Sequence, residues 1–337
     1  MKLAVVQSGV LIAVLSGIVM AQTTLHTTTT LVVVPTVVQT QEKALVFSLT
    51  ADDFILTDNG VPQKVTLEEE SKRPLSLVVL IQTGGIARGQ FPNYNNLEAM
   101  LAEILGKGTN EASIVNFDSR IEGVSPFTTD IAQWREAIDK PDQGNSGAAI
   151  FDSIEYGLGL LRKEPASNRR AILLISQEHD DGSTAPMKEI VRDLGETNTA
   201  IYSITFSGEK TKAKLAFTEP AHLNPPIDIG CGPTQGYAKL DEPLRLIFGG
   251  MLKNVSAEMA SLSGGEVMSF DGRGELEQDL NVLNNHIRNS YILSFSPSST
   301  KPGLHTIKVQ LAHHPEMIVS ARSNYWASDL NAPVTNR

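Results

Sequence analysis

Runs of apolar residues alternate with helical stripes over most of this chain. Five runs are almost continuously apolar, as expected of strands buried on both faces of a parallel sheet: residues 75–82, 112–117, 171–176, 200–206 and 265–270. Apolar residues recur at helical spacing in residues 131–138, 150–161, 252–262 and 276–287. This alternation predicts an α/β fold with a doubly wound, mostly parallel sheet and helices on both faces.

One segment predicts an exception to the parallel order. Residues 119–127 follow the strand at 112–117 with no room for a crossover helix, so we expect an antiparallel edge strand joined by a hairpin. Local signals also mark helix ends. Thr129 or Asp130 is suited to cap the helix that follows, and Gly264-Gly265 is typical of a helix stop.

The chain has β-type patterns near both of its ends. The amino-terminal runs are residues 31–34 and 37–38, which Pro35 separates, then 44–49, 54–57 and 63–67, and the carboxyl-terminal runs are 291–295, 304–311 and 318–322. Asn59-Gly60 adopts positive φ at low cost, which predicts a hairpin between residues 54–57 and 63–67. Unpaired strand edges are a liability, so we expect the two terminal segments to pair in a small β module.

The first 21 residues have the pattern of a secretory signal peptide. Lys2 precedes an apolar run at residues 11–20, and Val19-Met20-Ala21 forms a small-residue cleavage site. We expect cleavage and export to the periplasm or beyond the cell. The alternative is a membrane anchor, although the run is about half the length of a span. The predicted divisions are the signal peptide at 1–21, an N-terminal β segment at 22–72, an α/β domain at 73–290, a C-terminal β segment at 291–326 and a tail at 327–337.

Composition narrows the classes of partner. Hydrophobic residues make up 41% of the 337 residues and charged residues 20%, which is typical of a globular soluble chain. The formal net charge is −10, which disfavours nucleic acid and anionic membranes as partners. Cys231 is the only cysteine, so one chain cannot form an internal disulfide.

Several short motifs, taken together and in order, resemble one group of proteins. They lie at residues 51–54, 58–63, 74–80, 169–176, 224–228, 262–266 and 291–297. Together they resemble bacterial exported VWFA-related proteins of the acidobacterial type, which contain a von Willebrand factor A-like (VWA) domain. The resemblance implies a VWA/Rossmann-like sheet with flanking β elements and no established biochemical activity.

The resemblance also implies a place for a metal-ion-dependent adhesion site, at the carboxyl ends of the central strands. In the family, two Asp, two Ser and one Thr hold Mg²⁺, a hard cation that prefers oxygen ligands. The corresponding positions in this chain are Gln82, Gly84, Ile86, Ala148 and Gln177. None of these residues supplies a carboxylate or a hydroxyl, so we expect no metal and no cofactor at this degenerate site. Residues 178–181 are the alternative source of ligands.

The loops around the degenerate site form the predicted interaction face. The long segment at residues 207–247 leaves the carboxyl end of a strand, and loops of this length are often functional. We expect it either to cover this face and bind a peptide-like partner or to serve only as a structural wrap. The candidate contact residues are Thr83, Gly85, Glu178, His179, Asp180, Asp181, Pro225, Pro226 and Asp228.

Three classes of function follow from this pattern. We expect a non-enzymatic module that binds a protein without a metal, and the alternative is a structural or assembly component of an envelope or secretion complex. A cation-dependent binder with non-standard ligands is a further alternative. The chain contains no Gly-x-Ser-x-Gly elbow, no His-Glu-x-x-His and no phosphate-binding loop, which disfavours an enzyme.

Overall fold

This computed structural model describes most of the chain. The described residues are 31–68, 73–139, 141, 144–208, 210–211, 242–251, 253–299 and 301–327. The predicted signal peptide, most of the long loop with Cys231, Pro225, Pro226 and Asp228, and residues 328–337 of the predicted tail lie outside them. No helix within the described residues is long and apolar enough to cross a membrane.

The centre of the fold is a mostly parallel sheet of six strands in the order β10-β9-β8-β5-β6-β7. Its strands are β5 (Leu75–Gln82), β6 (Glu111–Phe117), β7 (Ile121–Val124), β8 (Arg169–Gln177), β9 (Ala200–Phe206) and β10 (Val267–Phe270). Only β7 is antiparallel, and it pairs with β6 at one edge. The predicted strands at 75–82, 112–117, 171–176 and 200–206 are confirmed as buried, and the predicted antiparallel edge strand is present. The run at 265–270 does form a strand, but the prediction that it is buried is wrong, because β10 lies at the other edge of the sheet and only Phe270 in it is buried.

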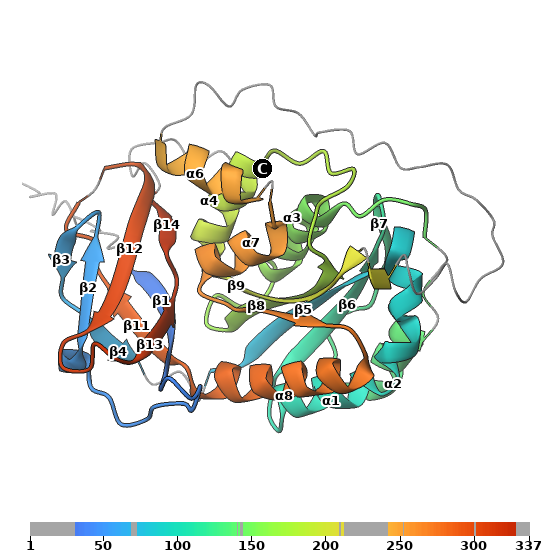
Figure 1. The fold of residues 1–337 in the computed structure, drawn as a ribbon, viewed down its shortest axis with the longest axis horizontal. Coiled ribbons are helices and arrows are strands. Elements are labelled where there is room, and N and C mark those ends of the chain that lie inside the picture. Colours follow the sequence, from blue (N-terminus) through green and yellow to red (C-terminus); the bar gives the residue numbers. More distant parts are fainter. Residues whose placement is uncertain are drawn as a thin grey trace, which may run out of the picture. The chain divides into compact units, whose positions relative to one another are not determined.

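Helices cover both faces of this sheet (Figure 1). Alternate strand residues point to opposite faces, so Leu77 and Val79 belong to one apolar cluster while Val78 and Leu80 belong to the other. The first cluster includes residues of the 3₁₀ segment η3 (Gly85–Tyr94), α1 (Leu97–Leu105), α2 (Ile131–Asp139) and α8 (Arg273–Asn289). The second includes residues of α3 (Ile150–Leu161), α4 (Met187–Thr197), α6 (Glu242–Met251) and α7 (Val255–Ser263).

The predicted helix boundaries at α2 and α7 are confirmed by the contacts at those positions. Asp130 Oδ1 accepts a hydrogen bond from the Ala132 amide at 2.9 Å, so Asp130 rather than Thr129 caps α2. Helix α7 ends at Ser263, and Gly264 follows it in the left-handed conformation with φ of 81°. Helices α1, α4 and α6 were not predicted, and α6 begins at Glu242, inside the predicted long loop at residues 207–247.

Strands from both ends of the chain pair in two antiparallel sheets. One has the order β13-β1-β11-β4, with β1 (Val32–Gln39), β4 (Thr66–Glu68), β11 (Tyr291–Phe295) and β13 (Ile318–Ala321). The other has the order β14-β12-β2-β3, with β2 (Phe54–Asp58), β3 (Val61–Gln63), β12 (Gly303–Leu311) and β14 (Asn324–Ala327). Asn59 and Gly60 have φ of 48° and 82°, which confirms the predicted hairpin turn between β2 and β3.

Three details of the predicted β segments are wrong. Residues 44–49 form no strand beyond a single bridge between Leu45 and Gln39. The run at 63–67 divides between β3 and β4, which belong to different sheets. Pro35 does not separate two strands but lies inside β1, next to the last residue that pairs with β13, where its missing N–H breaks no ladder.

A buried polar cluster lies between β2, β12 and β14. His305 Nδ1 lies 2.8 Å from Asp58 Oδ1, the Tyr325 hydroxyl donates to Asp58 Oδ2 at 2.8 Å, and His305 Nε2 lies 2.7 Å from the Lys301 carbonyl. All three side chains are almost fully buried. Buried polar groups are costly unless they are bonded, so this cluster requires each of its members.

We expect Tyr325→Phe to lower the free energy of unfolding by about 1–2 kcal/mol, because Asp58 Oδ2 loses its buried donor. Urea denaturation measures the change. Tyr156→Phe is the matched control, since Tyr156 is exposed on α3, and it should change the free energy by less than about 0.5 kcal/mol. Equal effects of the two variants would contradict a structural role for the buried hydroxyl.

Asp279 on α8 makes stability depend on pH. Its Oδ2 is buried without a hydrogen-bond partner, and burial, assisted by nearby Glu275, raises the pKa of Asp279 from 3.8 to about 6. The folded state therefore holds this proton more tightly than the unfolded state, and stability from this group falls as pH rises from about 4 to about 6.

We expect Asp279→Asn to stabilise the protein at neutral pH by about 1 kcal/mol, a figure that allows for solvent screening of a partly exposed group. The gain should vanish below about pH 3, where the wild-type carboxyl is protonated in both states. The melting temperatures of the wild type and the variant, measured across this pH range, show whether the gain in stability disappears. A gain that persists unchanged at the acidic end would show that charge is not its cause.

Candidate functional site

The five degenerate positions come together at the carboxyl ends of the central strands. Gln82 ends β5 and Gln177 ends the neighbouring strand β8. The Gln82 side chain is fully buried, and its Nε2 donates to Gln177 Oε1 at 3.2 Å and to the Gly84 carbonyl at 3.1 Å. Its Oε1 accepts from the Gln177 amide at 2.9 Å. We call this pair the amide lock.

The amide lock uses the oxygens that a cation would need. Gln82 Oε1 and Gln177 Oε1 each accept a hydrogen bond within the pair, and Gln177 Nε2 donates to the His179 carbonyl at 2.8 Å. The lock is neutral, so it ties the two strand ends together without a charge that a bound cation would balance. Among the described residues, no group of three or more His, Cys, Asp or Glu side chains is placed to hold a metal ion.

Gly84 lies against the loop at residues 144–149, so closely that no side chain fits. A Cβ at this position would collide with the Gly147 carbonyl, and it would lie 2.5 Å from Asp118 Cβ and 2.8 Å from the Asn145 carbonyl. The next residue, Gly85, has φ of 60° and donates its amide to the Asn145 carbonyl at 2.6 Å. The position of a family serine is therefore a contact between two backbones.

The remaining two positions are packed as well. Ala148 is fully buried and exchanges two backbone hydrogen bonds with Asp181, at 2.8 and 2.9 Å. Ile86 is half-buried against the core cluster of α1, α2 and α8, and its Cδ1 faces Gly208 just beyond β9. Backbone contacts at Ala148 and apolar contacts at Ile86 thus fill these two positions.

Three aspartates, Asp118, Asp152 and Asp180, hold the surrounding loops, a role that the sequence pattern did not predict for any of them. Asp118 is buried after β6, and its two oxygens accept from the Arg120 amide at 2.9 Å and the Asn145 amide at 2.6 Å. Asp152, in the first turn of α3, accepts from the Thr184 and Ala185 amides. The position of Asp118 directly after a buried strand was the available signal.

Asp180 is the third anchor and one of the predicted contact residues. Its Oδ1 accepts from the Phe151 amide at 3.1 Å and from the Ser183 hydroxyl, so it caps the amino end of α3. Burial raises the pKa of Asp180, while its hydrogen bonds act in the opposite direction. The carboxylate is therefore part of the loop structure.

The other predicted contact residues differ in exposure. Thr83 is buried, and its hydroxyl donates to the Phe117 carbonyl at 3.1 Å, so it offers no surface to a partner in this structure. Gly85, Glu178 and Asp181 are half-buried, and His179 is exposed. The part of the predicted interaction face that the structure describes is therefore narrow and centres on Glu178 and His179.

Comparison with known proteins gives structural likenesses alone. No protein-family model matches the chain, and no curated protein matches it. Similar solved structures include an aerotolerance-related membrane protein from Bacteroides fragilis, with 13% identity over 63% of this chain and 98% of that chain and a TM-score of 0.38. They also include BatB from Bacteroides thetaiotaomicron, with 11% identity over 63% of this chain and 98% of that chain and a TM-score of 0.36. The VWA domain of SpRpn10 has 12% identity over 62% of this chain and 94% of that domain, and its TM-score is 0.36.

Proposed function

We propose that this chain is an exported, VWA-like, non-enzymatic module that binds a protein without a metal ion. The observation that supports this most is the amide lock, in which Gln82 and Gln177 bond to each other where the family holds a cation. The proposed contact surface is the strand-end face around Glu178 and His179. Loops at the carboxyl ends of strands are the usual place for ligands in such sheets.

Metal independence has a direct test. Isothermal titration of the full chain with Mg²⁺, Mn²⁺ and Ca²⁺ should give no one-site binding, and none of the three ions should raise the melting temperature. The reason is that a dication in this crevice would meet no uncommitted anionic ligand among the five family positions. Saturable one-site binding would overturn the proposal in favour of a cation-dependent binder, and Asp180 and Asp181 would then be the first residues to replace.

Partner binding needs a second experiment with a matched control. Crosslinked capture from the native source should retain the same partner in the presence of EDTA and lose it in the double variant Glu178→Ala with His179→Ala. The control is His314→Ala with Glu316→Ala, a pair of the same residue types between β12 and β13. A partner that needs Mg²⁺, or that survives the first double variant, would contradict the proposal.

The second candidate is an assembly component that uses the β module. It is favoured by apolar residues exposed there, among them Phe47 at 58%, Val61 at 53% and Ile55 at 46%. Exposed apolar residues mark contact surfaces when they are grouped. Loss of the captured partner in Phe47→Ser, with retention in the Glu178 and His179 variant, would support this candidate over the first.

A further inference from the structure

A cavity of about 350 Å³ lies at the opposite end of the sheet from the amide lock. It is lined by Leu75 and Arg169, where β5 and β8 begin, and by Val33 of β1 and Ile292 of β11. Sites for small molecules start at about 300 Å³. The cavity is therefore large enough for a compact organic molecule.

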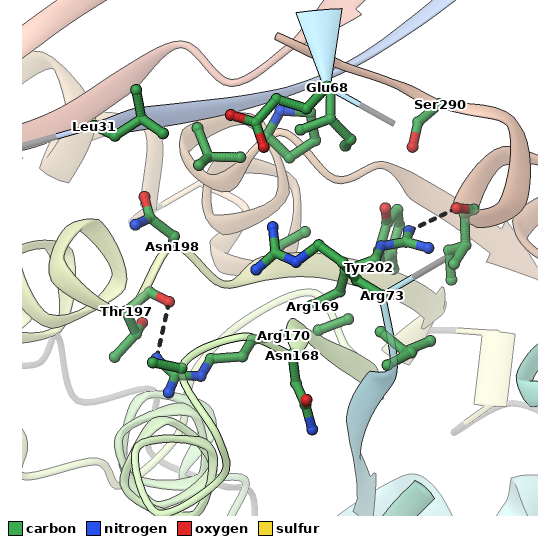
Figure 2. A pocket seen from close by; sticks show the side chains of 18 of the residues that line it. Leu31, Glu68, Arg73, Asn168, Arg169, Arg170, Thr197, Asn198, Tyr202 and Ser290 are labelled. Carbon is green, nitrogen blue, oxygen red and sulfur yellow. Dashed lines mark hydrogen bonds between the residues drawn. The ribbon is translucent and has the colours of Figure 1, made fainter. Parts of the chain in front are cut away.

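Three arginine side chains gather around this cavity, and we call it the arginine cavity (Figure 2). Arg73 Nε donates to the Ser167 carbonyl at 2.7 Å, and Arg169 donates to the Ile287 carbonyl at 2.7 Å. Arg170 donates to the carbonyls of Glu164 at 3.0 Å and Thr197 at 3.5 Å. Bonds to backbone carbonyls fix the directions of the guanidinium groups before any ligand arrives, which lowers the cost of binding.

One nitrogen of the Arg170 guanidinium has no hydrogen-bond acceptor in the protein. This nitrogen, Nε, is buried. Burial lowers the pKa of this guanidinium, Glu164 acts in the opposite direction, and the charge of Arg162 adds a smaller lowering effect. Burial makes this cation costly, and an anion in the cavity that Arg170 lines would offset that cost.

The rest of the lining limits the kind of anion. Glu68 and Glu196 also line the cavity, so three positive and two negative side chains face it, and this balance suits one negative charge better than several. The other walls combine apolar residues, with Leu31, Pro35 and Ile287 among them, and polar residues such as Asn168 and Ser290. Guanidinium groups match the planar fork of a carboxylate.

We propose that the arginine cavity binds a monocarboxylate that carries an apolar group. The guanidinium groups of Arg73, Arg169 and Arg170 hold the carboxylate, and the apolar walls cover the attached group. The site is separate from the strand-end face, so it stands or falls independently of the proposed function.

Phenylacetate is the probe, and its neutral isostere phenylacetamide is the matched ligand control. Titration of the full chain with phenylacetate should show binding at one site. Phenylacetamide, which lacks the carboxylate, and acetate, which lacks the apolar group, should each bind with an affinity lower by about tenfold or more. Inorganic phosphate should also be weaker. An acetylated tripeptide that ends in phenylalanine, compared with phenylacetate, tells whether the natural carboxylate belongs to a free acid or to a chain end.

Substitutions at the arginine cavity test whether phenylacetate binds there. Leu31 is 45% exposed at the cavity wall, so Leu31→Glu should fold normally while its carboxylate repels the ligand and competes for the arginines. It should weaken phenylacetate binding by about tenfold, whereas Leu31→Gln should change it by less than about threefold. Arg170→Gln should also weaken binding, with circular dichroism to confirm its fold, and Arg273→Gln on the surface of α8 should have no effect.

Several results would overturn the proposal. Equal affinity for phenylacetate and phenylacetamide would show that the arginines do not recognise the carboxylate. Equal affinity for phenylacetate and acetate would show that the apolar walls do not contribute to binding. Phenylacetate binding that Leu31→Glu leaves unchanged would place the site elsewhere. Absence of saturable phenylacetate binding would exclude this ligand class for the cavity.

Discussion

Gly84→Ser should lower the free energy of unfolding by about 3 kcal/mol or more. The Cβ of the new serine would collide with the Gly147 carbonyl and lie 2.8 Å from the Asn145 carbonyl. Backbone atoms cannot rotate away as a flexible side chain can, so the loop at residues 144–149 must move. Urea denaturation measures the loss, and titration with Mg²⁺ should show no gain of metal binding.

The matched control is Gly159→Ser on α3. A Cβ at Gly159 meets no atom within 4 Å, so the same substitution should be neutral or stabilise the helix by about 0.5 kcal/mol. A Gly84→Ser protein as stable as the wild type would mean that the two loops are not in contact in solution. The proposed closure of the family metal site would then lose its main support.

Arg322→Met should cost about 3–5 kcal/mol, the range for breaking a buried charged network. The guanidinium is 3% exposed and donates to four acceptors, the carbonyls of Asn324 at 2.8 Å, Val33 at 3.1 Å and Gly195 at 3.3 Å, and Asn198 Oδ1 at 2.9 Å. Burial lowers the pKa of Arg322 to about 10, so the group remains charged at neutral pH.

The position of Arg322 explains the expected size of this effect. Val33 and Asn324 belong to the β module, whereas Gly195 and Asn198 lie at the carboxyl end of α4, where the helix dipole favours a cation. One side chain therefore joins the terminal strands to the α/β domain. Arg273→Met, which breaks only an exposed pair with Glu277, should cost less than about 0.5 kcal/mol under the same denaturation. A comparable loss in both variants would contradict the assigned role.

The central strands could be predicted because their apolar runs have no other interpretation in a chain of this length. Helices α1 and α4 could not, for different reasons. Helix α1 follows η3, a segment that contains Pro92 and several polar residues, and α4 buries few apolar positions among charged ones. The strand predicted at residues 44–49 is absent because apolar content does not show whether a partner strand is available, and Phe47 is 58% exposed.

The candidate site, like the fold, could be predicted from the sequence only in part. Motif order and spacing placed Gln82 and Gln177 at adjacent strand ends, and the structure confirms that adjacency. Sequence patterns could not show that the two amides bond to each other or that Asp118 binds the Asn145 amide, because those contacts depend on how separate loops meet. The arginine cavity was not predicted, since its lining residues come from segments far apart in the chain.

The pairing of strands from both ends of the chain constrains the route by which the protein folds. The Tyr291 hydroxyl donates to the Val46 carbonyl, 245 positions away, and β1 pairs with both β11 and β13. Contacts between residues so distant in sequence slow folding, because the loop must close before the contact forms. During synthesis, β1 and β2 emerge long before their partners β11 and β12, which begin at residues 291 and 303. We therefore expect the growing chain to expose strand edges that need protection from aggregation during that interval.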